Sequence, residues 1–149
     1  MAKTTSNLMV AQPRSLDNAA FSAGLGARDH DHVARVAAKA YARIMAAWKL
    51  NNNEAADLIA VSPRTWARMK TSAWAGRLSK DQLMRVSAIT GLYKGLHLYF
   101  SDTLADRWIT LRNTGPMFGG RSPAEAMIEG GLPAIIETRG YVDALRGGV

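Results

Sequence analysis

The stretch NNEAADLIAVSPRTWARMK, residues 52–70, carries the pattern that decides the fold. It predicts two short helices joined by a tight turn, the first over Asn53–Ala60. Ser62 and Pro63 favour the start of the second helix, because a serine side chain caps a free amide and proline fits the first helical position. The second helix is expected to continue through Arg64–Lys70.

The small and apolar positions of this stretch have a characteristic order. Ala56 is small where two helices must cross closely, and Val61 is expected to be buried in the turn. Trp66 and Met69 lie three positions apart, on the inner face of the second helix. This order resembles the helix-turn-helix of Xre/Cro-type regulators. Ala60 stands where that motif usually has a left-handed glycine, a replacement that costs about 1 kcal/mol.

The outward face of the second predicted helix is basic. Arg64 and Arg68 are four positions apart and share one face, and either guanidinium can pair with both acceptors of guanine. In a helix-turn-helix this helix enters the major groove of DNA. Thr65 and Lys70 are expected to contact the DNA backbone, and the amides after Ser62 can hold a phosphate. The alternative is a solvated basic face without a ligand.

Charge is unevenly distributed along the chain, whose formal net charge is +7. Residues 61–113 carry nine Lys and Arg residues against three Asp residues, whereas residues 114–149 carry three Arg residues against four acidic residues. Because DNA is a polyanion, the first segment suits DNA and the second does not. Arg77, Lys80 and Arg85 are placed to extend the row of phosphate contacts.

Helical patterns continue on both sides of the motif, and residues 1–30 lack periodicity and are expected to form a mobile arm. The apolar stripe of the preceding helix, His32–Trp48, comprises Val33, Val36, Ala40, Ile44 and Ala47. A helix is expected from Lys80 to about Thr90, then a break at Gly91 and Gly95, then a further helix up to Phe100. Another helix is expected over Thr103–Arg112, with Asp102 as its cap. The last two are expected from Ser122 to Gly130-Gly131 and from Leu132 to Leu145. No segment alternates with period two, so an all-α fold is predicted.

The four tryptophans indicate where the core of the predicted helical fold lies. Trp48, Trp66 and Trp108 are expected in the core. Trp74 lies in a predicted loop, where it is either core or an exposed anchor.

The segment PMFGGRSPAEAMIE, residues 116–129, is expected to bind a partner protein. Phe118 can pack onto the helices while Gly119-Gly120 adopts conformations that other residues resist, and Arg121 then projects before a capped helix. The chain ends in TRGYVDALRGGV, residues 138–149, whose small last residues could thread into a narrow cleft beside Arg146. An ordinary capped turn and a frayed end are the alternatives.

The last two predicted helices carry more apolar residues than such a pair can bury alone, so some are expected at an interface. These positions are Met127, Ile128, Leu132, Ile135, Ile136, Tyr141, Val142 and Leu145.

A helix-turn-helix followed by this C-terminal segment resembles the Xre/MbcA/ParS antitoxin family. The matching residues are Pro116, Phe118, Gly119, Gly120, Arg121, Ser122, Pro123 and Glu125, then Tyr141, Val142, Asp143, Ala144, Leu145, Arg146, Gly147 and Gly148. Members are usually encoded beside a RES-domain toxin that degrades NAD⁺. The resemblance implies an antitoxin that blocks the toxin's active site with its C-terminal module and represses its own promoter.

Within that module the expected toxin-binding residues are Arg121, Tyr141, Arg146, Gly147, Gly148 and Val149. Arg146 could pair with a carboxylate of the toxin's active site. The expected organisation is an arm at 1–30, a helix-turn-helix domain at 31–100 and a toxin-binding domain at 101–149. The protein is expected to dimerise, because helix-turn-helix units usually read paired half-sites of operator DNA.

Other function classes are not favoured. The chain has no cysteine, its three histidines lack a metal-ligand spacing, and no nucleophile or phosphate-loop motif supports an enzyme, so no cofactor or metal is expected. Without a long apolar run or a signal-like N-terminus, the expected location is the cytoplasm rather than a membrane. The remaining alternative is a stand-alone regulator whose C-terminal half only dimerises.

Overall fold

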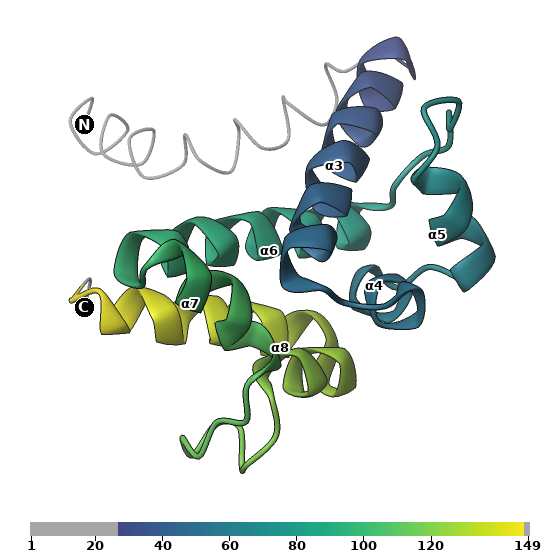
Figure 1. The fold of residues 1–149 in the computed structure, drawn as a ribbon. Coiled ribbons are helices and arrows are strands. Elements are labelled where there is room, and N and C mark those ends of the chain that lie inside the picture. Colours follow the sequence, from purple (N-terminus) through teal and green to yellow (C-terminus); the bar gives the residue numbers. More distant parts are fainter. Residues whose placement is uncertain (1–26, 148–149) are drawn as a thin grey trace, which may run out of the picture.

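The computed structural model describes residues 27–147, and this part of the chain is helical with no strand, which confirms the all-α prediction. The elements are α3 (Ala27–Trp48), α4 (Asn52–Ile59), α5 (Pro63–Met69), α6 (Lys80–Tyr99), α7 (Asp102–Arg107), the 3-10 helix η1 (Trp108–Thr110) and α8 (Pro123–Leu145). α6 runs through the middle of the molecule, with α8 along one side and α3 crossing it (Figure 1).

α3 differs from its prediction at its start and on its buried face. It begins at Ala27, so the predicted arm is too long, and residues 1–26 lie outside the described residues. Val36 is 54% exposed, whereas Tyr41 and Trp48 are almost fully buried. The two large aromatic side chains remove more apolar area from water than valines do, and they set the rotation of the helix.

Local signals define the turn between α4 and α5. Asn51 caps α4 with Glu54 in a reciprocal capping box, and Ser62 caps α5 by accepting a hydrogen bond from the Thr65 amide. Ala60 ends α4 in the left-handed conformation, at φ 59° and ψ 47°, as the motif predicts. Val61 is half-buried rather than buried.

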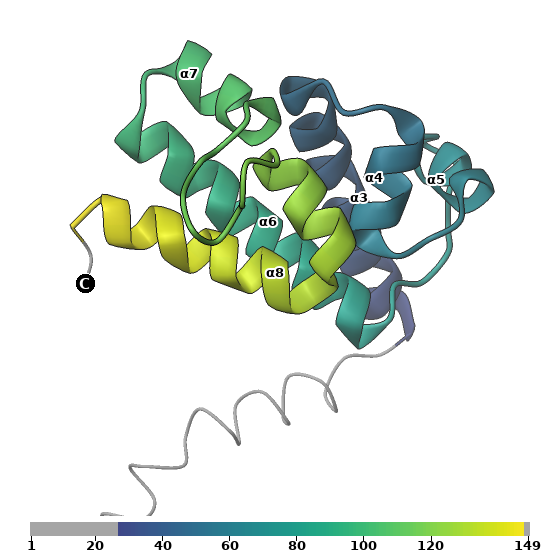
Figure 2. The ribbon, with the colours of Figure 1, turned by 90° about the horizontal axis from the view of Figure 1, so that it is seen from below.

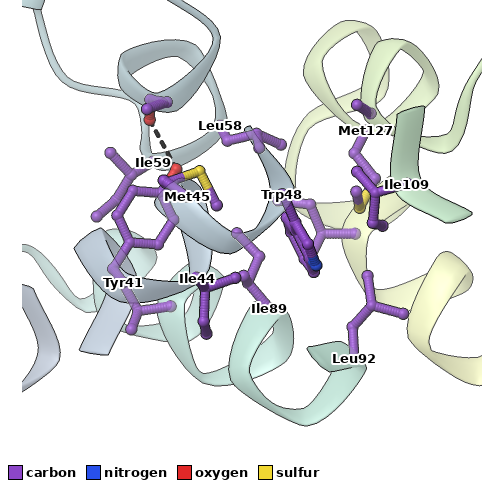
Figure 3. Packing of buried hydrophobic residues seen from close by; sticks show 14 of the residues in the cluster. Tyr41, Ile44, Met45, Trp48, Leu58, Ile59, Ile89, Leu92, Ile109 and Met127 are labelled. Carbon is purple, nitrogen blue, oxygen red and sulfur yellow. Dashed lines mark hydrogen bonds between the residues drawn. The ribbon is translucent and has the colours of Figure 1, made fainter. Parts of the chain in front are cut away.

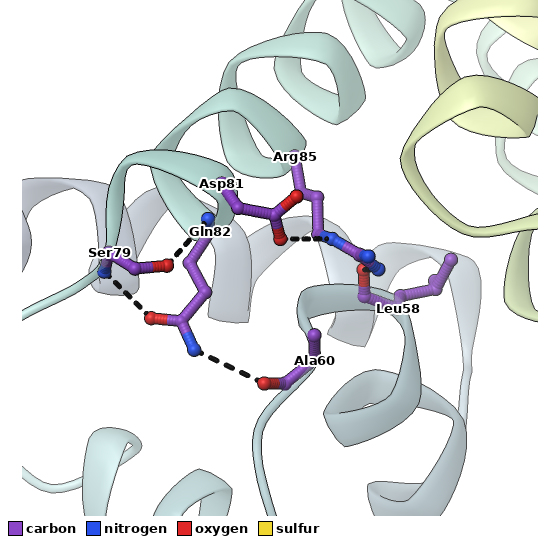
Figure 4. Close-up of polar contacts among 6 residues, drawn as sticks. All are labelled: Leu58, Ala60, Ser79, Asp81, Gln82 and Arg85. Carbon is purple, nitrogen blue, oxygen red and sulfur yellow. Dashed lines mark hydrogen bonds and ion pairs between the residues drawn. The ribbon is translucent and has the colours of Figure 1, made fainter.

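Two side chains from the start of α6 hold this turn (Figure 4). Gln82 Nε2 donates to the Ala60 carbonyl at 3.1 Å, and Arg85 donates to the Leu58 carbonyl at 3.2 Å. Arg85 is also paired with Asp81 at 2.8 Å. These contacts offset the cost of an alanine in the left-handed conformation.

The core lies where α3, α4, α6 and α8 meet (Figure 3). Tyr41 is buried, and its hydroxyl donates to the Ala55 carbonyl at 2.6 Å, which ties α3 to α4. Burial raises the pKa of Tyr41 well above its ordinary value. Trp48, Trp66 and Trp108 are buried as predicted. Trp74 is also buried, at 8% exposure, so the exposed-anchor alternative is wrong.

α6 is continuous through Gly91 and Gly95, so the predicted break there is wrong. Both glycines face α8. A β-carbon on Gly91 would lie 2.3 Å from the Arg139 guanidinium carbon, and one on Gly95 would lie 3.3 Å from a Val142 methyl. Gly95 therefore allows close packing of α6 against α8, whereas Gly91 leaves room for the Arg139 guanidinium, and the packing against α8 offsets their low helix propensity of about 1 kcal/mol each.

α7 is shorter than predicted, because η1 replaces its second half. Ser101 rather than Asp102 is the N-cap residue. The Asp102 carboxylate instead lies 3.1 Å from His97 Nδ1, and Asp106 lies 2.8 Å from His97 Nε2. His97 thus links the end of α6 to α7.

This link makes stability depend on pH. Partial burial lowers the pKa of His97, but the hydrogen bonds to Asp102 and Asp106 outweigh it and raise the pKa above its ordinary value of about 6.5. The stabilisation is complete below the pKa of the unfolded chain and is lost as pH rises through the folded value. Urea unfolding at pH 6 and pH 8 is expected to show lower stability at pH 8. His97→Gln should reduce the difference in unfolding free energy between the two pH values. An unaltered difference would contradict the role of His97 in pairing with Asp102 and Asp106.

The loop between η1 and α8 closes on itself and is anchored by Phe118. The Gly120 amide donates to the Asn113 carbonyl at 2.9 Å, and the Asn113 amide donates to the Arg121 carbonyl at 3.1 Å. Gly119 and Gly120 have positive φ values of 61° and 87°, as expected. Phe118 is fully buried, edge-on to both Trp108 and Tyr141.

α8 begins with the predicted capping box of Ser122 and Glu125 and bends at Gly131, where φ is 68° and ψ is −154°. The bend confirms the predicted end of one helical segment near Gly130-Gly131. Such backbone angles are accessible essentially only to glycine.

Gly131→Ala is expected to destabilise the fold by about 1–3 kcal/mol, because alanine resists these angles. Gly140→Ala is the matched control. No atom lies within 4 Å of an added β-carbon there and the backbone is helical, so a gain of about 0.5–1 kcal/mol is expected. Thermal unfolding of both variants measures the contrast, and equal effects would contradict the account of the bend.

The hydrophobic core continues across residue 100. Met127, Ile135 and Val142 of α8 are fully buried, in one cluster with Ile89 and Leu92 of α6. Ile136 remains 49% exposed. Much of the apolar surface expected at an interface is therefore covered within the chain, while the division into units at residue 100 stays a prediction.

Candidate functional site

The basic face of α5 is built on a short, well-capped helix. Ser62 Oγ accepts from the Thr65 amide and donates to the Thr65 hydroxyl, both at 3.0 Å. Pro63 has no amide hydrogen, and the Trp66 amide donates to the Ser62 carbonyl at 2.9 Å. The Arg64 amide is thus the donor of this first turn that stays available for a phosphate.

Lys70 lies at the end of α5 and is held against the start of α4. Its Nζ donates to Asn52 Oδ1 at 2.8 Å, and the same oxygen accepts from Trp66 Nε1 at 3.2 Å. Lys70 Nζ also lies 5.8 Å from the centre of the Trp66 ring. Asn52 therefore fixes the position of Lys70. Sequence reasoning missed this role, which the asparagine in the first turn of α4 could have suggested.

Arg64 and Arg68 both lie on the outward face of α5. Both are exposed, and neither guanidinium forms a hydrogen bond or ion pair with any residue of the described range 27–147. They line an open groove together with Ala67, Trp74 and the loop after α5. The structure thus brings the two predicted guanine-reading side chains to one open face.

The predicted extension of this face is only partly available. Lys80 is exposed, and Arg77 is exposed beside Asp31, at 3.6 Å. Arg85 does not extend the row, because its side chain is only 16% exposed and is bound to Asp81 and to the turn after α4. Its role is to hold the helix-turn-helix together.

Two expected toxin-binding residues have structural partners. Arg121 donates to the Phe118 carbonyl at 3.1 Å and is paired with Glu129, so it closes the loop before α8. The Tyr141 ring is half-buried and stacks on Trp108 with centroids 6.2 Å apart. Both side chains retain exposed surface, but Arg121, which the sequence predicted to project, is held by the Phe118 carbonyl and by Glu129.

The end of α8 is more open. Arg146 caps the helix and donates to Asp143 Oδ1 at 3.1 Å, and Gly147 turns the chain with φ 78°. Gly148 and Val149 lie outside the described residues. In both ribbon views this end lies at the opposite end of the molecule from α5 (Figures 1 and 2). The two predicted sites are therefore far apart.

Residues 27–147 show no cluster of three or more His, Asp and Glu side chains that could hold a metal ion. Across the described residues, no helix has the length and apolarity needed to cross a bilayer.

Comparison with known proteins gives two matches. The family model for the antitoxin Xre-like helix-turn-helix domain matches residues 27–91, which contain α3 to α5 and the first part of α6. The uncharacterized protein y4oB of Sinorhizobium fredii is 34% identical over 118 residues, covering 77% of this chain and 89% of that protein. No solved structure matches the chain. By these similarities, the chain belongs to the same family as y4oB, and its residues 27–91 form an antitoxin Xre-like helix-turn-helix domain.

Proposed function

We propose that this protein is the antitoxin of a type II toxin–antitoxin pair that neutralises a RES-domain, NAD⁺-degrading toxin and represses its own promoter. The observation that carries the proposal is the open pair of Arg64 and Arg68 on the second helix of an antitoxin-type helix-turn-helix. An exposed arginine pair that is unpaired within the part of the chain the structure describes suits bidentate recognition of guanine.

In this proposal α5 reads operator DNA as one half of a homodimer. Arg64 and Arg68 contact base edges, whereas Ser62, Thr65 and Lys70 position the helix on the backbone. Asn52 supports this arrangement because it holds Lys70 at the junction of α4 and α5.

The C-terminal module binds the toxin. The motif from Phe118 to Glu125 builds a rigid, capped platform, and Arg121 and Tyr141 present its exposed edge. Beyond α8, Arg146 and the small residues 147–149 enter the cleft of the toxin and block it. Because α5 lies at the other end of the molecule, this function does not compete for the surface proposed for DNA.

Deleting residues 146–149 is expected to abolish protection when the protein is co-expressed with its RES-domain toxin, because the blocking segment is gone. Growth and cellular NAD⁺ measure protection, and co-purification measures complex formation. Arg43→Ala, a change on the exposed side of α3, is the control and should protect fully. Full protection by the truncated chain would reject the blocking role of the tail.

A stand-alone regulator that only dimerises is the second candidate. It is favoured by apolar side chains left exposed where α6 ends, namely Leu98 at 73% and Tyr99 at 45%. Such residues suit an interface with a second copy. Purification from the native host separates the two: a stoichiometric enzyme partner supports the antitoxin, and a lone homodimer supports the regulator.

A further inference from the structure

We infer that a second anion-binding site, formed by Lys49 and Arg107, takes a backbone phosphate of the DNA that α5 reads. The inference rests on the proposed DNA-binding function. It adds a contact from α7, which follows the helix-turn-helix in the chain.

The site is a pocket of about 500 Å³ between the end of α3 and the α7–η1 segment. Trp48 and Lys49 line one side, and Thr103 and Arg107 line the other. Lys49 has a positive φ of 57° and follows directly after α3. Arg107 is the last residue of α7. Lys49 and Arg107, which are 58 positions apart in the sequence, thus line the same pocket.

The charges of the pocket favour an anion. Neither the Lys49 ammonium nor the Arg107 guanidinium has a hydrogen-bond or ion-pair partner among residues 27–147, and both side chains are exposed. The one carboxylate in the lining, Asp106, lies 2.8 Å from His97 Nε2. His97 has a raised pKa, so its positive charge offsets Asp106 over a wider pH range. The two cations and a threonine hydroxyl suit the oxygens of a phosphate.

The position of the pocket favours DNA as the source of that phosphate. Lys49 lies two residues before Asn51, the N-cap of α4, and the next residue, Asn52, holds Lys70 at the end of α5. Along the upper edge of Figure 2, α7, the end of α3, the start of α4 and α5 follow one another. The elements that carry Arg107, Lys49, Lys70 and Arg68 therefore succeed one another along one edge of the molecule, an arrangement that can follow a DNA backbone.

The test measures operator affinity of the full-length protein across a range of salt concentrations. In the Lys49→Gln plus Arg107→Gln variant, affinity is expected to fall roughly tenfold, and the slope of log K against log salt is expected to fall in magnitude by about 1, as for the loss of one phosphate contact. The loss should be the same for operator and non-operator DNA, because phosphate contacts carry no sequence information.

Lys94→Gln is the matched control, since it removes one exposed charge from the outer face of α6. An equal loss in that variant, or an unchanged slope in the double variant, would overturn the inference. Either of these results leaves the proposed function intact, provided that the wild-type protein binds the operator and that replacing Arg64 and Arg68 removes its preference for the operator. A wild-type protein that binds no DNA would instead remove the proposed function, and this inference with it. Thermal unfolding should be unchanged in both variants, because the side chains lie at the surface.

Discussion

Replacing Arg64 and Arg68 together with alanine is expected to abolish specific operator binding, with a loss of at least about 30-fold in affinity. Each bidentate arginine–guanine pair contributes about 1–3 kcal/mol of discrimination, and both pairs are removed. The fold should be unaffected, because both side chains are exposed on α5 and have no partner among the described residues. A gel shift at fixed salt with the native promoter fragment measures the effect.

The matched control is Arg43→Ala, which removes the same side chain from the exposed face of α3. It should leave operator affinity nearly unchanged. Weak binding to unrelated DNA should persist in the double variant through the remaining cations. Unchanged operator affinity in the double variant would show that the basic face of α5 is only solvated surface.

Phe118→Ala is expected to have the largest effect on stability, a loss of about 3–5 kcal/mol. The ring is fully buried, with centroids 5.8 Å from Trp108 and 5.4 Å from Tyr141, both edge-on. Its removal leaves a cavity and releases the loop that carries Gly119 and Gly120. Because a typical domain is stable by only about 5–15 kcal/mol, the variant should be close to unfolding at physiological temperature.

Urea unfolding of Phe118→Ala against Leu111→Ala provides the comparison. Leu111 is 39% exposed at the end of η1, so its truncation should cost less than about 1 kcal/mol. Phe118→Leu should lie between the two, since leucine fills part of the cavity. Equal losses at positions 111 and 118 would contradict the role of Phe118 as the anchor of the C-terminal module.

The sequence predicted the parts of the fold that local chemistry determines. Ser62 and Ser122 cap helices through their own side chains, and Ala60 takes the left-handed conformation because the turn between two short helices requires it. These interactions form between residues only a few positions apart, so they can be predicted without knowledge of the rest of the fold. The bend at Gly131 belongs to the same class.

Tertiary packing determined what the sequence could not. Gly91 and Gly95 read as helix breakers, yet α8 packs against them and α6 continues. The rotation of α3 depends on where Tyr41 and Trp48 find space in the core. Trp74 lies in a loop that carries no periodic signal, yet it is buried, next to residues of α3. Each outcome depends on a partner distant in the sequence.

In the candidate site, too, local spacing predicted some features, whereas others depend on tertiary packing. Exposure of Arg64 and Arg68 followed from helical spacing, whereas the diversion of Arg85 to the Leu58 carbonyl depends on how α6 meets α4. The Arg121 pairing with Glu129 likewise depends on the path of the loop before α8. Helical spacing tells which side chains share a face, but not which of them find a partner across elements.

Protection of cells from a RES-domain toxin is the role we propose for this chain. Its most direct test is cellular NAD⁺ after the protein of the adjacent reading frame is expressed alone or together with this chain. We expect NAD⁺ depletion by the neighbour alone, and normal NAD⁺ with a stable complex of both proteins when they are expressed together. NAD⁺ depletion that persists in the presence of this chain, with no complex on purification, would contradict it.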